Sequence, residues 1–186
     1  MAVDEYKLLS GAWLDAIGTI VSAIAEGREL AGIQNSNELL VTIGEGLQAV
    51  GSLLIGTVAT DNVLDFTGNW IDGVGASASS LGAYLQAFDE NGDDNIRLEA
   101  LGDTFQSMGS SISAAADHFE GEHDYAIGNA TQALGAGLEA IAGVFRLNER
   151  GEEAQPISTI GAVLQAIGSN FNAILYTNEL REQQLL

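Results

Sequence analysis

The stretch GAWLDAIG, residues 11–18, contains the pattern that decides the fold, because it recurs five more times along the chain. Each copy has glycine at its first and eighth positions, Asp or Gln at the fifth, and an apolar residue at the seventh. We call this eight-residue pattern the glycine phrase. The other copies are GEGLQAVG (44–51), GNWIDGVG (68–75), GDTFQSMG (102–109), GNATQALG (128–135) and GAVLQAIG (161–168).

The spacing of the glycine phrases shows how the chain is divided. They start 33, 24, 34, 26 and 33 residues apart, so long and short intervals alternate. The repeating unit is therefore a pair of phrases with a period of 57 to 60 residues, and a fixed period is the signature of stacked structural units. We interpret the chain as a single domain with three internal repeats, at about residues 1–60, 61–121 and 122–186.

Each phrase is predicted to lie on a helix. The apolar residues that follow Trp13 recur three, four and seven positions apart, which traces one helical face, and no strand pattern competes. Pro156 is expected in the first turn of the last helix, and Asn35 with Glu38 resembles a capping box for the second. The expected helices span 4–26, 36–59, 62–88, 95–119, 124–147 and 156–182. Short connections make neighbours antiparallel, so the predicted fold is all-α: three tandem helical hairpins in a bundle or short solenoid.

The phrase glycines are predicted to be helix-packing residues. A glycine inside a helix costs about 1 kcal/mol relative to alanine, so two in each of six helices indicate that close backbone contact is needed. We expect Gln48, Gln106 and Gln165 to border these contacts and to fix helix register by hydrogen bonds. The packing glycines are Gly11, Gly18, Gly44, Gly51, Gly68, Gly75, Gly102, Gly109, Gly128, Gly135, Gly161 and Gly168.

The apolar arc beside each glycine strip is expected to face the core. Trp13 and Trp70 occupy equivalent repeat positions in this arc, so both are predicted to be core residues. In this interpretation the glycines are small core residues of a soluble bundle. The alternative is that some glycine strips face outward and bind other copies of the chain or lipid.

The composition excludes several classes of function. Twenty-six acidic residues against six basic ones give a net charge of -20, which repels nucleic-acid phosphates and anionic lipid headgroups. There is no cysteine, so the chain has no disulfide, thiolate metal site or thiol nucleophile. Acidic residues near the N-terminus replace the basic region of a Sec signal peptide, so we expect a cytoplasmic protein or one exported by another route.

The segment FDENGDDNIRLEA, residues 88–100, resembles the start of an EF-hand calcium loop. Asp89, Asn91 and Asp93 match the first three ligand positions. The loop's glycine position holds Asp94, and its bidentate acidic position holds Ala100. We therefore favour a turn between helices, with Gly92 as a helix cap, over a weak calcium site.

No catalytic set is apparent, and we expect neither an enzyme nor a cofactor-binding protein. The pair Glu120 and His123 forms a single E-x-x-H, whereas di-iron helical bundles need two copies. Gly121 falls inside that motif and is expected to end the helix, so we predict a solvated turn there, with a surface metal site at His118 and His123 as the alternative. No small-molecule substrate is suggested by any motif.

The phrases GAWLDAIGTIVSAI and GNWIDGVG resemble an uncharacterised repetitive all-helical family of spore-forming Gram-positive bacteria. The resemblance covers most of the chain. It implies an all-helical fold and lends no activity and no site residues.

Two functions remain from the sequence. The favoured one is a structural or scaffolding protein that forms a homo-oligomer through helix faces, because an open end of a helical array invites another copy. The alternative is an amphitropic or pore-forming protein that inserts into a membrane as an oligomer, with its Gln row lining the lumen. Membrane insertion is disfavoured because acids such as Asp15, Glu45, Asp72 and Asp103 would each cost roughly 2.5–3.5 kcal/mol in lipid unless they faced water or protein.

Overall fold

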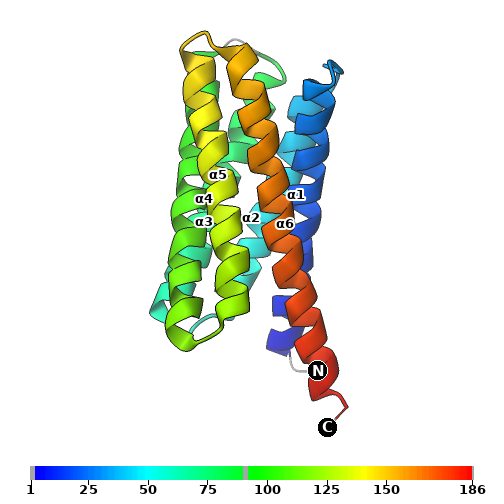
Figure 1. Cartoon of the computed structure of the whole chain (residues 1–186), viewed down its shortest axis with the longest axis vertical. Helices are drawn as coiled ribbons and strands as arrows, with labels where there is room; N and C mark the ends of the chain where they lie inside the picture. Colours follow the sequence, from blue (N-terminus) through cyan, green and yellow to red (C-terminus); the bar gives the residue numbers. More distant parts are fainter. Residues whose placement is uncertain (1–2, 90–91, 186) are drawn as a thin grey trace.

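The computed structural model describes residues 3–89 and 92–185, and these form six long helices without a strand (Figure 1). The all-α prediction is therefore confirmed. The helices are α1 (Val3–Leu30), α2 (Asn37–Gly56), α3 (Val63–Gln86), α4 (Asp93–Glu120), α5 (His123–Leu147) and α6 (Gly151–Gln183).

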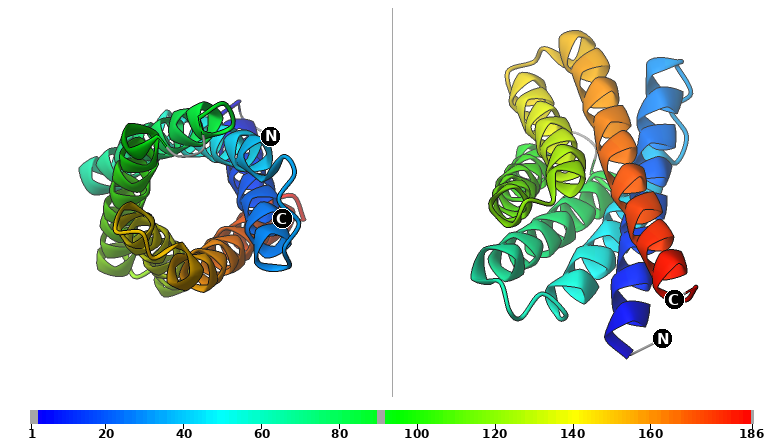
Figure 2. Two further views of the ribbon diagram at one scale, coloured as in Figure 1. Left: turned by 90° about the horizontal axis from the view of Figure 1, so that it is seen from above. Right: turned by 60° about the horizontal axis from the view of Figure 1, so that its bottom comes forward.

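The six helices close into a ring, as the view along its axis shows (Figure 2). In the described parts of the chain, each helix packs against its neighbours in sequence, and α1 also packs against α6. The fold is thus a closed bundle of three hairpins and has no open solenoid end. Both termini and the α2–α3 and α4–α5 connections lie at one end, the terminal end, and the other three connections lie at the distal end (Figure 1).

All twelve phrase glycines are buried at helix contacts within this one chain. In each hairpin the first phrase glycine of one helix meets the second phrase glycine of the other. The pairs are Gly11 with Gly51 and Gly18 with Gly44 in the first hairpin, Gly68 with Gly109 and Gly75 with Gly102 in the second, and Gly128 with Gly168 and Gly135 with Gly161 in the third. A Cβ at any of these positions would collide with the facing helix, usually with its backbone. The alternative of outward-facing glycine strips is therefore wrong for these twelve residues.

Several helix ends differ from the sequence predictions. The last helix begins at Gly151, so Pro156 lies beyond the first turn and not within it. The second helix is capped by Ser36, which adopts a left-handed conformation with φ 65° and makes no side-chain cap bond, so Asn35 and Glu38 form no capping box there. Gly121 ends α4 with φ 87°, as expected from the sequence, because glycine tolerates the left-handed conformation without a steric cost.

The interior of the ring is polar, which reverses the expected arrangement. The largest fully buried side chains are Gln48, Gln106, Asn37, Thr19, Ser79 and Ser169, and most buried apolar residues are alanines. Trp13 and Trp70 are 37% and 39% exposed, so the prediction that they are core residues is wrong. The periodicity located the apolar arc correctly, but the helices turn that arc outward and their polar residues toward the axis.

Candidate functional site

The fifth and seventh positions of the glycine phrase lie on opposite sides of the ring wall. Its fifth residue is buried or half-buried in every helix and belongs to the polar interior, which we call the lumen. These residues are Asp15, Gln48, Asp72, Gln106, Gln132 and Gln165. Its seventh residue is a large apolar side chain that is exposed in every helix: Ile17, Val50, Val74, Met108, Leu134 and Ile167. The two positions are 200° apart on a helix, so they point to opposite sides of the wall.

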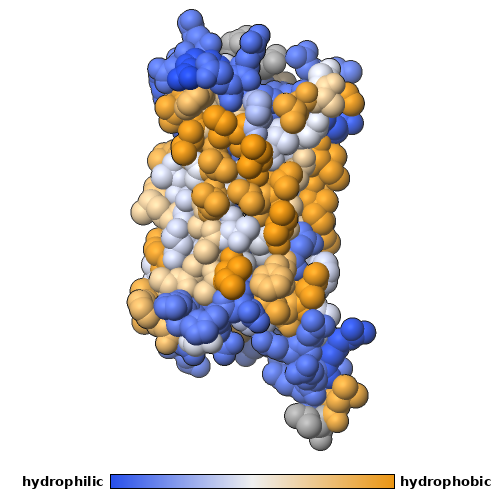
Figure 3. Space-filling model, viewed as in Figure 1, coloured by the Kyte–Doolittle hydropathy of each residue, from blue (hydrophilic) through white to orange (hydrophobic). Residues whose placement is uncertain are grey.

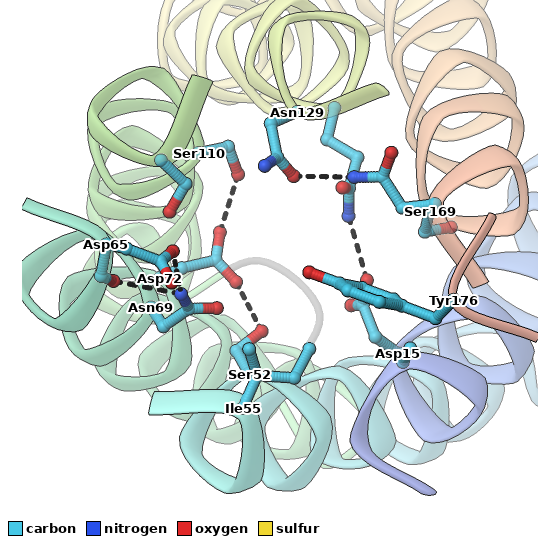
Figure 4. Close-up of a pocket in the computed structure, with 14 residues that line it drawn as sticks. Asp15, Ser52, Ile55, Asp65, Asn69, Asp72, Ser110, Asn129, Ser169 and Tyr176 are labelled. Carbon is cyan, nitrogen blue, oxygen red and sulfur yellow. Dashed lines mark hydrogen bonds between the residues drawn. The ribbon is translucent and has the colours of Figure 1, made fainter. Parts of the chain in front are cut away.

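The part of the lumen near the terminal end is a small polar chamber, which we call the terminal chamber (Figure 4). All six helices contribute to its lining, and its free volume of ≈ 30 Å³ has room for about one or two water molecules. The Asp72 carboxylate accepts hydrogen bonds from Ser52 at 2.6 Å and Ser110 at 2.8 Å. On the other side of the chamber, Gln132 donates to Asp15 at 2.9 Å, although α1 and α5 are not neighbours in the ring.

Midway along the axis, a layer of glutamines and carboxylates fills the lumen, and we call it the central layer. It consists of Gln48, Gln106, Gln165, Glu45, Asp103 and Glu139, all of them buried. Glu45 is its best-connected member, because it accepts hydrogen bonds from Ser22 at 3.1 Å, Gln48 at 2.7 Å and Gln106 at 2.8 Å. Gln165 donates to Glu139 on the adjacent helix.

The three glutamines predicted to set register therefore all bond to carboxylates. Gln106 and Gln165 bond to other helices, and Gln48 bonds to its own helix and, at 3.4 Å, to Ser22 of α1. Asp15, Asp72 and Gln132 were not identified as register residues from the sequence. Their shared fifth position in the phrase was the signal that could have identified them.

Toward the distal end the lumen widens into a cavity of ≈ 290 Å³, the distal vestibule. Glu26, Glu29, Glu38 and Glu99 line it together with a single basic residue, Arg146. Arg146 forms an ion pair with Glu99 at 3.2 Å, and Gln86 donates to the same carboxylate at 2.5 Å. The vestibule therefore keeps an excess of acidic over basic side chains.

Charged residues also gather at the distal rim, outside the lumen. Arg97 pairs with Asp94 at 2.8 Å and with Asp93 at 3.4 Å. Arg150 donates from Nε to Glu153 at 2.9 Å, and this bond lowers the pKa of the Glu153 carboxyl. Such exposed pairs contribute little to stability, but they make this end of the ring hydrophilic.

The outer wall of the ring carries a belt of large apolar side chains between two hydrophilic ends (Figure 3). The seventh phrase residues form part of this belt, and aromatic residues such as Trp13, Trp70 and Phe105 extend it. Monomeric soluble proteins seldom expose contiguous apolar patches larger than a few hundred Å².

Two helices also satisfy a simple test for membrane crossing. By length and composition alone, α1 and α2 are apolar enough to span a bilayer, and 44% and 50% of their most apolar windows are buried in the ring. Core helices of soluble proteins and signal sequences have the same length and composition.

The turn that resembles a calcium loop lies between α3 and α4. Asn91 falls outside the described residues, and Asp93 is the first residue of α4, where it pairs with Arg97. Gly92 precedes α4 with φ -74°, so it is an N-cap and not the left-handed cap that was expected. Within the residues that the structure describes, no group of three or more His, Asp or Glu side chains is placed to hold a metal ion.

The two histidines lie beside each other at the turn between α4 and α5. The rings of His118 and His123 are 5.1 Å apart between centroids. Glu120 is the last residue of α4 and accepts a hydrogen bond from Asn62 at 2.6 Å. Both histidines are exposed, as a solvated turn requires.

These features define a class: a closed ring of six helices with a polar, acidic lumen and an apolar outer wall. By sequence, the chain belongs to DUF6944, a family of unknown function, whose profile matches residues 6–173. The expectation that the chain belongs to an uncharacterised family is thus confirmed. No curated protein and no solved structure matches the chain.

Proposed function

We propose that this protein is embedded in a membrane, where its six helices surround a polar pathway. The observation that carries the proposal is the reversed polarity of the wall, in which the fifth phrase residue faces the lumen and the seventh faces outward in all six helices. In water, an exposed belt of Ile, Leu and Val is unfavourable by roughly 25 cal/mol per Å² of apolar surface. Lipid acyl chains would remove that cost.

The main objection to membrane insertion is the cost of placing the acids of the helices in lipid, and the positions of these acids answer it. Asp15 and Glu45 accept hydrogen bonds from Gln132 and Gln106, which lie on helices across the lumen. Asp72 and Asp103 are bonded by serines of neighbouring helices. The large cost of an acid in a bilayer applies to a side chain that faces lipid, and these four face protein and lumen.

The dimensions of the helices suit a bilayer. The shortest, α2, has 20 residues and is about 30 Å long, which matches the hydrocarbon core of a typical bilayer. Backbone polar groups inside a bilayer must be satisfied internally, and a ring of complete helices meets this requirement. Ion pairs and acids at the distal rim would lie among headgroups and water.

This proposal modifies the membrane-active alternative derived from the sequence. There, an oligomer was needed to form a lumen lined by the Gln row. Here, one chain encloses its own lumen, so the pathway requires no second copy.

Self-assembly is the second candidate, and the same apolar belt favours it. Copies of the ring that pack side by side would bury the belt without lipid and would form the homo-oligomer expected from the sequence. The argument for self-assembly from the sequence, an open end of a helical array, no longer holds, because α1 packs against α6 and closes the ring. We therefore place it below the membrane proposal.

Cell fractionation tests the proposal. The full chain would be expressed in bacterial cells, and the membranes would be washed with alkaline carbonate, which removes peripheral proteins. We expect the chain to stay in the membrane pellet. Its recovery in the soluble fraction as a monomer would reject the membrane location, and recovery there as a discrete oligomer would favour self-assembly.

A further inference from the structure

The central layer contains one carboxylate from each hairpin: Glu45 on α2, Asp103 on α4 and Glu139 on α5. We propose that this layer makes the lumen a pathway for protons and closes it to hydrated ions and larger solutes. The inference rests on the proposed membrane location, and it names what the pathway carries.

The first two hairpins build their part of the layer in the same way. Ser22 of α1 donates to Glu45 of α2, and Ser79 of α3 donates to Asp103 of α4. In both, the acid follows the first phrase glycine of the second helix, and the serine stands opposite on the first helix.

The third hairpin carries its acid on the other helix, and alanine replaces the acid of the first two hairpins. The residue that follows its corresponding glycine, Gly161, is Ala162, and the residue opposite on α5 is Glu139 in place of serine. Helix packing alone would be satisfied by serine and alanine at these sites. The hairpin nevertheless supplies one carboxylate at the same level as the other two, which points to a requirement for the acid itself.

Side chains that reach across the axis close the lumen at this level. Gln106 of α4 donates to Glu45 of α2 at 2.8 Å, although these two helices are not neighbours in the ring. Gln48 and Gln106 are each only 1% exposed, and no member of the central layer lines either the terminal chamber or the distal vestibule. A hydrated cation needs a water-filled path or a set of ligands that replaces its water, and a layer bonded to itself provides neither.

A proton moves between oxygen atoms that can hold it, and the lumen supplies such atoms in the carboxyls of Glu45 and Asp103 and in the hydroxyls of Ser22 and Ser79 that bond to them. Gln106 donates from Nε2 to Glu45 and, at 3.4 Å, to the Ser79 hydroxyl, so it holds these oxygens in place and does not itself carry the proton. On α4, Glu99 lies four residues before Asp103, a rise of about 6 Å, and it lines the distal vestibule.

Polar side chains also lie between the central layer and the terminal chamber. The hydroxyls of Thr19 and Ser169 are 2.7 Å apart, and Ser169 lines the terminal chamber together with Asp15. Polar groups therefore lie at successive levels from one end of the lumen to the other. Chains of acidic side chains serve as proton relays in other membrane proteins.

The transfer step is balanced without a further reactant. A carboxylate of the central layer takes up a proton that arrives from one end of the lumen and becomes a neutral carboxyl. It then releases a proton to an acceptor on the other side and is a carboxylate again. The driving force is the proton gradient or the membrane potential, and no bond other than O–H forms or breaks.

The test uses the full chain in phosphatidylcholine vesicles that contain a pH-sensitive dye. A potassium diffusion potential, set with valinomycin, draws protons inward, and parallel vesicles hold calcein. Flotation on a density gradient first establishes that the protein is in the bilayer. We expect proton uptake faster than in protein-free vesicles and full retention of calcein.

The decisive variants are Glu45→Gln and Glu139→Gln, which keep the shape of the side chain and remove its exchangeable carboxyl proton. Each should reduce proton uptake to the rate of protein-free vesicles while floating like the parent. The matched control, Glu152→Gln, changes an exposed glutamate in the first turn of α6 and should leave uptake unchanged. Two variants are used so that a fold defect in one, detected by circular dichroism, leaves the other as the test.

The possible failures are distinguishable. A parent protein that does not float rejects the membrane location. One that floats without proton uptake, or whose Glu45→Gln and Glu139→Gln forms conduct normally, overturns the proton pathway alone. Release of calcein by the parent would show an open lumen and would also overturn it.

Discussion

Gly18 and Gly44 lie against each other where α1 crosses α2, and neither has room for a side chain. A Cβ on Gly18 would stand 2.5 Å from the carbonyl oxygen of Gly44, and a Cβ on Gly44 would stand 2.7 Å from that of Gly18. Both obstacles are backbone atoms, which cannot move aside as a flexible side chain can. This contact, repeated in each hairpin, holds the wall of the ring together.

Gly18→Ala is therefore expected to destabilise the protein. Forcing a methyl group into a filled contact typically costs about 1–3 kcal/mol, more than alanine gains from its helix propensity. The control is Gly27→Ala, because a Cβ at Gly27 on the same helix meets nothing within 4 Å. Thermal unfolding should show a lower melting temperature for the first variant and an equal or higher one for the second. Equal stability of both variants would contradict the close contact.

The outward position of the apolar arc predicts that an acidic substitution in the middle of the belt will reduce membrane binding, whereas one at the edge of the belt will not. Val74 lies on the outer face in the middle of α3, and Val63 is exposed at the first residue of the same helix. Val74→Asp should lower the membrane-bound fraction, because an acid facing lipid costs roughly 2.5–3.5 kcal/mol. Val63→Asp should not. If both variants fractionate like the parent, the belt does not face lipid.

The hydrogen bond between Gln106 and Glu45 predicts that replacing Gln106 lowers the free energy of unfolding. Gln106→Leu would leave a buried carboxylate oxygen without its donor, which typically costs about 1–3 kcal/mol of unfolding free energy. Gln183→Leu, at the exposed end of α6, should change it by no more than about 0.5 kcal/mol. Denaturant titration of both variants measures the difference, and equal midpoints would argue against a structural role for the bond.

The sequence predicted the helices and hairpins well because the evidence for them is local. The alternation of phrase spacings and the three-four-seven pattern around Trp13 report backbone periodicity, which does not depend on the surroundings of the helix. The orientation of each helix was predicted wrongly, because the rule that apolar faces turn inward was applied, whereas the helices turn their polar fifth phrase residues toward the axis and their apolar arcs outward. Trp13 and Trp70 do belong to the apolar arc, as predicted. Because that arc was predicted to face the core, both residues were placed on the wrong side of the wall.

The lumen could be predicted only in part. The phrase predicted close helix contact at its glycines and hydrogen-bonded glutamines beside them, Gln48, Gln106 and Gln165, but it did not predict which glycines face each other. Pairs such as Gln132 with Asp15 could not be predicted, because they join helices that are neighbours neither in sequence nor in the ring. Only closure of α1 against α6 brings such residues to one axis.

Calcium should not stabilise the fold. Asp93, one of the proposed ligands, already pairs with Arg97 at the start of α4, and Gly92 precedes that helix as its N-cap. Thermal melts in excess calcium and in chelator should give the same melting temperature. A ligand that bound only the folded state would raise it, so a clear rise with calcium would show a site at this turn.

The two tryptophans provide the most direct test of whether the apolar wall faces lipid. Trp13 and Trp70 are the only tryptophans in the chain, and both lie on the outer face of the ring. Their fluorescence would be measured in vesicles of ordinary and brominated phosphatidylcholine, and with iodide in the surrounding water. A wall that faces lipid predicts strong quenching by the brominated chains and weak quenching by iodide. Strong quenching by iodide with none by the brominated lipid would contradict the membrane location.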